Sequence, residues 1–179
     1  MTQAPDAAAT PAFADLQGHL DALRTRDPVT VRAGHEDLGE GLWLSCDPAG
    51  QTEMTCGPDE AGFRLTVTGA DSGVWASFGM RLPADVLFRG RYLGLLIEAE
   101  PSGLVSFSPT LRYRFRDGGL QDAGLPDPVV LPGGPQVHLS HIPIDPALAE
   151  RTGDCELNLF FHSDAVDMRV LRMEPLLIS

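Results

Sequence analysis

The spacing of hydrophobic residues along the chain changes near residues 27 and 28. Before that point, hydrophobic residues recur at helical spacing, at Phe13, Leu16, Leu20 and Leu23. Thr10 and Pro11 suit the cap and first turn of a helix, and Asp27-Pro28 ends it. We therefore expect a disordered tail over 1–9 and a short helix within 10–27. The apolar stripe of that helix needs cover, from its own domain, a partner helix or a second subunit.

After Pro28 the chain consists of short segments, several with alternating hydrophobic and polar residues, separated by Gly, Pro and Asp. The predicted strands are 29–33, 42–46, 51–56, 63–68, 74–82, 91–100, 104–116, 129–131, 136–144, 155–163 and 165–178. We expect a hairpin-type turn over 69–73, a surface loop over 117–134 and a tight junction over 163–165. The pattern predicts an all-β domain over 28–179, a jelly-roll β-sandwich of two antiparallel sheets preceded by one short N-terminal helix.

Charge and hydropathy narrow the classes of partner. The formal net charge is −12, and all thirteen basic residues are Arg, as is typical of GC-rich coding sequences. Such acidity argues against nucleic acid or an anionic membrane as partner. The sequence contains no apolar run of about 20 residues, and its first ten residues lack the features of a secretory signal. We therefore expect a cytoplasmic protein.

The chain offers little metal or catalytic chemistry. Cys46, Cys56 and Cys155 are widely spaced in apolar stretches, which predicts buried free thiols. His138 and His141 are three residues apart on a predicted strand, so they point to opposite faces and do not form a metal-binding pair. No nucleophile elbow, phosphate loop or zinc-protease motif is present. We expect no catalytic residue, no metal site and no cofactor. The one exception is a structural calcium ion, to which Asp164 and Asp167 could contribute carboxylates.

Three arginines form a ladder on one face of the predicted strand 104–116. Arg112, Arg114 and Arg116 alternate with apolar residues, so like charges repeat about every 7 Å and require compensation. One interpretation is cross-strand pairing with Glu98 and Glu100. The other is a groove in which the guanidinium groups bind hydroxyls, carboxylates or sulfates of a ligand.

An exposed aromatic residue supports the groove. Trp75 shares a predicted strand face with Ser77, Gly79 and Arg81, an arrangement suited to stacking of a sugar ring. The alternatives are that Trp75 stacks on Arg81 or is covered by the N-terminal helix. Trp43 beside Ser45 invites the same interpretation more weakly. The candidate ligand-binding residues are Trp75, Arg81, Arg112, Arg114, Arg116, Asn158 and His162.

The closing stretch ELNLFFHSDAVDMRVLRMEPLLI, residues 156–178, resembles the last hairpin of jelly-roll carbohydrate-binding modules of the galactose-binding-like group. The resemblance implies a ligand site on a concave sheet face or on rim loops, and a structural calcium ion in many members. We therefore expect a non-catalytic module that binds a glycan, and the arginines suit an acidic one. The first alternative is a protein-interaction or assembly domain, with a protein partner or a second copy bound. The second is an enzyme that combines His162 with Asp167 or Glu98.

Overall fold

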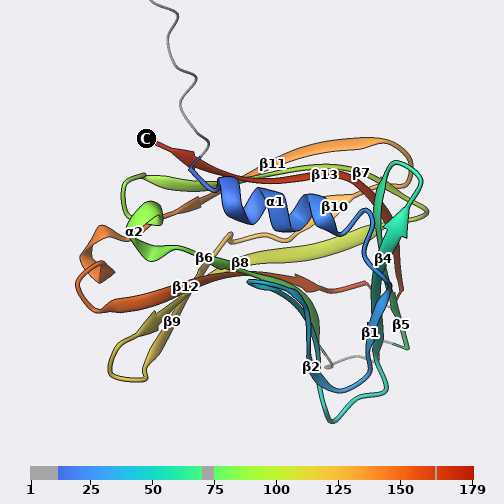
Figure 1. Cartoon of the computed structure of the whole chain (residues 1–179), viewed down its shortest axis with the longest axis horizontal. Helices are drawn as coiled ribbons and strands as arrows, with labels where there is room; N and C mark the ends of the chain where they lie inside the picture. The colour runs from blue at the N-terminus through green and yellow to red at the C-terminus, as the bar shows by residue number, and fades with distance from the viewer. Residues whose placement is uncertain (1–11, 70–74, 164) are drawn as a thin grey trace, which may run out of the picture.

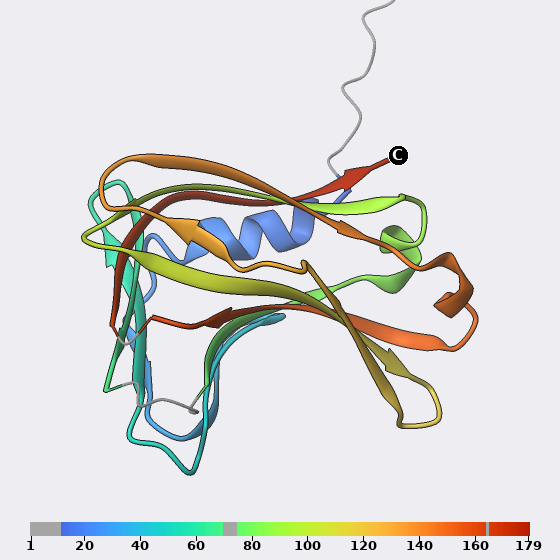
Figure 2. The ribbon, with the colours of Figure 1, turned by 180° about the vertical axis from the view of Figure 1, so that it is seen from behind.

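The structure, a computed structural model, describes residues 12–69, 75–163 and 165–179. Two antiparallel sheets pack face to face as a sandwich, with a short helix between them (Figures 1 and 2). The predicted all-β jelly-roll fold is confirmed.

The six-stranded sheet has the order β1-β4-β5-β13-β7-β11. Its strands are β1 (Val29–Val31), β4 (Glu53–Asp59), β5 (Gly62–Thr68), β7 (Tyr92–Pro101), β11 (Gln136–Pro143) and β13 (Val166–Ile178). The register between β13 and β7 shifts between Val170 and Arg172, and this bulge changes which β13 residues face the core.

The seven-stranded sheet has the order β10-β8-β12-β6-β3-β2, and β9 pairs with β8. Its strands are β2 (Gly34–Gly39), β3 (Leu42–Cys46), β6 (Ala76–Leu82), β8 (Val105–Phe115), β9 (Leu120–Gly124), β10 (Val129–Leu131) and β12 (Thr152–Phe161). In Figure 1, β9 projects at the lower left of this sheet and β2 lies at its lower right.

Helix α1 (Ala14–Ala22) is shorter than the predicted helix, whose proposed cap at Thr10 and Pro11 lies outside the described residues. Its predicted apolar stripe is buried in the core of its own domain, with Leu20 and Leu23 each 2% exposed. Just beyond the helix, Arg24 donates to the carbonyls of Ala61 and Leu171, at 2.9 and 2.6 Å, and so ties this end to the six-stranded sheet.

Two further helical turns are α2 (Ala84–Leu87), which the sequence analysis missed, and η1 (Pro146–Leu148). Among the described residues, no helix is long and apolar enough to cross a membrane.

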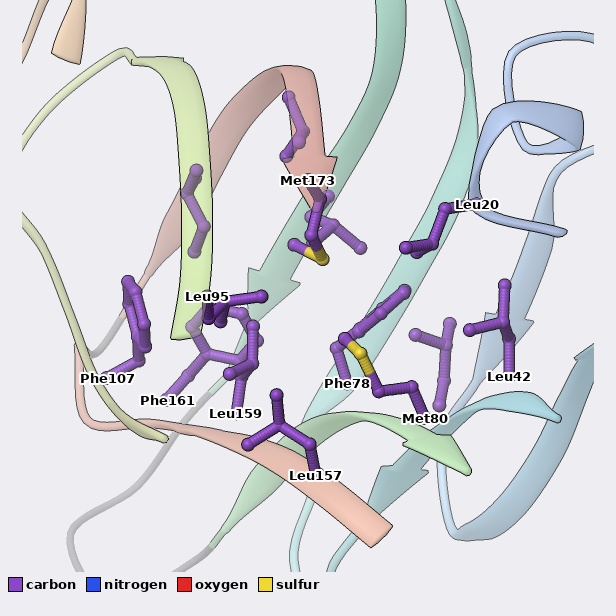
Figure 3. Close-up of a cluster of buried hydrophobic side chains, with 14 of the residues drawn as sticks. Leu20, Leu42, Phe78, Met80, Leu95, Phe107, Leu157, Leu159, Phe161 and Met173 are labelled. Carbon is purple, nitrogen blue, oxygen red and sulfur yellow. The ribbon is translucent and has the colours of Figure 1, made fainter. Parts of the chain in front are cut away.

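The core lies between the two sheets and follows from period-2 alternation. On β12, Leu157, Leu159 and Phe161 point inward, while Asn158 and Phe160 lie on the outer face. Burying one such leucine or phenylalanine contributes about 1.5–3 kcal/mol. Figure 3 shows core side chains from both sheets and the helix, at Leu20, Leu42, Phe78, Met80, Leu95, Phe107, Leu157, Leu159, Phe161 and Met173.

Three details of the predicted strand arrangement are wrong. The segment 34–39 forms strand β2 and residues 120–124 of the predicted loop form β9, whereas the predicted strand 129–131 is present as β10. The final strands β12 and β13 do not form a hairpin, because they belong to different sheets. The strands β5 and β6 also lie in different sheets, and residues 70–74 of the predicted turn lie outside the described residues.

Candidate ligand groove on the seven-stranded sheet

The outer face of the seven-stranded sheet is hollowed into a groove of about 790 Å³. Its floor and walls come from β2, β3, β6, β8 and β12 and from the residues next to them. The lining residues are His35, Asp37, Gly39, Glu40, Gly41, Trp43, Ser45, Trp75, Ser77, Arg81, Arg112, Arg114, Glu156, Asn158 and Phe160.

Strand register arranges the floor in three rows that run across the sheet. The first row places Ser45, Ser77 and Phe160 side by side, and the second row places Trp43, Gly79 and Asn158. The third row brings Arg81, Glu156 and Arg112 together. Small, aromatic, amide and charged groups therefore meet within one concave surface.

The indole of Trp43 lies across the backbone of Gly79. A Cβ atom at position 79 would overlap the indole, at Cε2 and Nε1, so this site requires glycine for its lack of a side chain. The His35 ring lies 5.7 Å from that of Trp43, centroid to centroid, and the Nδ1 of His35 is 3.1 Å from Ser45 Oγ. These contacts hold Trp43 in place, and it is 8% exposed.

Asn158 is the polar group of the floor whose hydrogen-bonding capacity is unfilled. The residue is 4% exposed, and its Nδ2 has no hydrogen-bond partner among the residues that the structure describes. A buried amide without a partner costs about 1–3 kcal/mol. A hydroxyl or carbonyl oxygen of a bound ligand would relieve that cost.

Two aromatic rings stand at one end of the groove. Trp75, just before β6, is 40% exposed and meets Phe160 of β12 edge to face, with 6.4 Å between the ring centroids. Trp75 is therefore neither stacked on Arg81 nor covered by the N-terminal helix. Its free surface is an apolar platform beside polar floor groups.

The three arginines of the groove are each paired with a carboxylate. Arg112 makes two hydrogen bonds to Asp122, at 2.8 and 2.7 Å, and Arg114 donates to Glu156 at 2.8 Å. The hydrogen bonds that Arg112 donates to Asp122 and, to a lesser extent, the charge of Asp122 raise the pKa of Arg112, while burial opposes them.

Arg81 lies 3.2 Å from Asp154, Nε to Oδ2. The positive charges of Arg81, Arg112 and Arg114 are thus neutralised within the protein.

The predicted pairing of the ladder with Glu98 and Glu100 is wrong. Both glutamates lie on β7 of the other sheet, where Glu98 pairs with Arg172 and Glu100 with Arg169. Alternation along β8 correctly placed Arg112 and Arg114 on an outer face. It could not show that the neighbours of β8 are β9 and β12 rather than β7.

Of the seven predicted site residues, the groove brings five together: Trp75, Arg81, Arg112, Arg114 and Asn158. Arg116 follows the end of β8 and is exposed outside the groove. His162 follows the end of β12, outside the lining, with its Nε2 2.7 Å from Ser108 Oγ.

Sequence reasoning missed several lining residues. His35 and Asp37 lie on β2, whose sequence GHEDLG lacks the apolar alternation that marks a strand. Glu156 was assigned no role, although alternation along β12 places it on the same face as Asn158. That signal was available in the sequence.

Other candidate chemistry lies elsewhere or has other partners. Asp167 accepts two hydrogen bonds from Arg64, each 2.7 Å, which lower the pKa of its carboxyl. Asp164 is outside the described residues. Within 12–69, 75–163 and 165–179, no cluster of three or more His, Cys, Asp or Glu could hold a metal ion. The partners of Asp167 and Glu98 lie on the six-stranded sheet, away from His162.

The three cysteines are free and buried, as predicted. Burial raises the pKa values of the Cys56 and Cys155 thiols to about 12. Low-pKa nucleophilic chemistry at these two thiols is therefore not supported.

Comparison with solved structures places the fold among carbohydrate-binding modules. The xylan-binding domain of Paenibacillus barcinonensis Xyn10C has a TM-score of 0.52 and 10% identity, and the match covers 89% of this chain and 91% of that domain. A carbohydrate-binding module of the β-sandwich superfamily has a TM-score of 0.51 and 10% identity, over 92% of this chain and 60% of the other.

A family 11 module of a Clostridium thermocellum cellulase has a TM-score of 0.49 and 9% identity, over 82% of this chain and 96% of the module. The two matches with TM-scores above 0.5 show a shared fold. No protein-family model and no curated protein sequence matches the chain.

Proposed function

We propose that this protein is a non-catalytic carbohydrate-binding domain, and that its ligand lies in the groove of the seven-stranded sheet. The fold it shares with carbohydrate-binding modules supports this function at the level of architecture. The groove supports it in chemical detail, because sugars present apolar C–H faces to aromatic rings and hydroxyls to polar groups.

The observation that carries the proposal is Asn158, whose nearly buried amide nitrogen has no partner among the described residues. A buried amide donor without a partner is uncommon in proteins, and at the floor of a groove a ligand can satisfy it. The exposed Trp75 lies on the same face of the sheet, so a sugar ring could stack there while a neighbouring hydroxyl reaches Asn158.

The charge distribution favours a neutral glycan over the acidic one expected from the sequence. Arg81, Arg112 and Arg114 already bind carboxylates, so an acidic sugar would compete with internal partners. Asp37 and Glu40 add negative charge to the lining. In a chain of net charge −12, such a groove repels anions at long range.

The test is a screen of immobilised neutral and acidic oligosaccharides, followed by calorimetric titration of those that bind. We expect binding of a neutral oligosaccharide that changes little with salt concentration. Trp75→Ala should weaken it by about tenfold or more, the loss of roughly 1.5 kcal/mol of stacking. Asn158→Leu should weaken it similarly by removing the polar donor.

Tyr92→Ala supplies the matched control, because Tyr92 is 43% exposed but lies on the six-stranded sheet. It should leave binding unchanged. Absence of any glycan binding, or equal losses for Trp75→Ala and Tyr92→Ala, would contradict the proposal. If the protein binds only acidic glycans, and salt weakens that binding, the proposed glycan-binding function would stand. The proposed preference for neutral glycans would be wrong.

A further inference from the structure

The described strands include five edge strands, and β11 differs from the other four. β1 and β10 are three residues long, β2 carries Glu36 and Asp37, and β9 carries Asp122. By contrast, β11 spans eight residues, Gln136–Pro143, and pairs with β7 on one side. Free strand edges are ready templates for pairing, and proteins usually protect long ones with charges, bulges or proline.

β11 has little of that protection. No Asp, Glu, Lys or Arg occurs anywhere in 128–144, in a chain with 21% charged residues. Proline occurs in β11 only at its last residue, Pro143, so the amide hydrogens of 136–142 that point away from β7, every second one, are available. Apart from its ladder with β7, residues 136–143 make no backbone hydrogen bond within the described part of the chain.

Apolar side chains are exposed along the same side of the molecule. Val137 is 73% exposed and Leu139 is 41% exposed, both on the outer face of β11. Val130, on the edge strand β10 of the other sheet, is 52% exposed. Tyr92, which pairs in register with Pro143, is 43% exposed. An uncharged strand edge flanked by exposed apolar groups marks an interaction surface.

We infer that this edge pairs with the same edge of a second copy, β11 antiparallel to β11 about a two-fold axis. The charge distribution is compatible with a second copy, because two molecules of net charge −12 repel each other least along a strand that carries no formal charge itself. The nearest carboxylate, Glu98 opposite Val137, is paired with Arg172. Antiparallel pairing of identical strands also matches the two edges in length and side-chain pattern.

The pairing joins two six-stranded sheets and leaves both grooves open. In Figure 1, β11 lies at the top of the view and β2 at the bottom, on the groove side, whereas part of β9 packs close to β11. A single strand pair and a few apolar side chains make a small interface, so the dimer is weak, with a Kd on the order of 10 μM.

Sedimentation velocity at pH 8, where histidine is neutral, tests the inference with the full chain. From about 1 to 200 μM, the mass should rise from that of the 19.2 kDa monomer towards twice that value. Val137→Lys should raise Kd at least tenfold, because it places two like charges at the pairing edge. Because the Val137 side chain is exposed, the melting temperature of the Val137→Lys variant should equal that of the wild-type protein.

Two controls separate the edge from general effects. Val137→Thr keeps a β-branched, uncharged residue and should still dimerise. Leu120→Lys adds the same charge at an exposed residue of β9, which is 57% exposed, and should leave Kd unchanged. In addition, amide exchange of 136–142 should slow as concentration rises.

A monomer at every concentration would overturn the inference. So would a dimer that tolerates Val137→Lys and leaves exchange of β11 amides unchanged. If the wild-type chain stays monomeric but captures a different protein through β11, the edge belongs to that partner and the second copy is excluded.

Discussion

The two sheets present outer faces of similar polarity but opposite organisation. On the six-stranded sheet, arginines and carboxylates pair in a continuous network. Arg169 contacts Asp59 and Glu100, at 2.5 and 3.1 Å, and Arg64 binds Asp167. On the seven-stranded sheet, the ion pairs lie at one end of a hollow that also holds aromatic rings and an unsatisfied amide. Polar alternation alone therefore does not distinguish a stabilising face from a binding face, whereas the partners of each group do.

The largest expected effect is on the six-stranded face. Arg169→Ala should lower the free energy of unfolding by about 2–3 kcal/mol, because it leaves the mostly buried carboxylate of Asp59 without its nearest cation. Glycan binding should be unchanged. Urea denaturation measures the loss, with Arg89→Ala as control. The exposed Arg89–Asp85 pair should contribute less than about 0.5 kcal/mol. Equal losses for both variants would remove the distinction between network and isolated pair.

The groove face should respond in a different way to a minimal change. Gly79→Ala places a methyl group where the Trp43 indole lies, so the ring must move. We expect a loss of about 1–2 kcal/mol in stability and a loss of glycan binding by tenfold or more. Gly103→Ala is the control, because nothing lies within 4 Å of a Cβ there. Unchanged binding in Gly79→Ala would show that the position of Trp43 does not matter to the ligand.

On the six-stranded face, the stabilisation from the Arg64–Asp167 pair should depend on pH in the acidic range. The hydrogen bonds from Arg64 lower the pKa of Asp167 below its usual 3.8. The stabilisation is therefore present above pH 4 and is lost as pH falls through 3.8 and below. Arg64→Met should lower the free energy of unfolding slightly at pH 7, and the difference from wild type should shrink as the pH falls towards 2. A difference that persists at pH 2 would point to lost packing instead.

The smallest effect concerns the inner faces, where the two sheets are alike. Cys56 belongs to the six-stranded sheet and Cys155 to the seven-stranded sheet, and burial raises both pKa values to about 12. Neither thiol should react with iodoacetamide at pH 8 until the protein unfolds. Stability should fall as pH rises above 9, because the unfolded thiols ionise first. Rapid native labelling of one cysteine would reveal local opening of its sheet.

Local pattern was enough to predict the strands with clear alternation and their faces, but not β2 or β9. Alternation placed Leu111 and Tyr113 in the core and Arg112 and Arg114 outside, because side-chain direction depends only on position along the strand. Alternation could not predict which strands are neighbours, because that depends on contacts between residues far apart in the sequence. For that reason Glu98 was taken as a partner of the ladder, while the true partners, Asp122 and Glu156, were missed.

Because of where the two tryptophans lie, the intrinsic fluorescence of the protein reports on the groove. The chain contains two, Trp43 and Trp75, and both line the groove. Trp43 is nearly enclosed and Trp75 is 40% exposed, so their emission should differ in wavelength and in access to a soluble quencher. All tryptophan fluorescence of the folded protein thus originates from this one surface. Changes there can be followed without a label, free of signal from the rest of the sandwich.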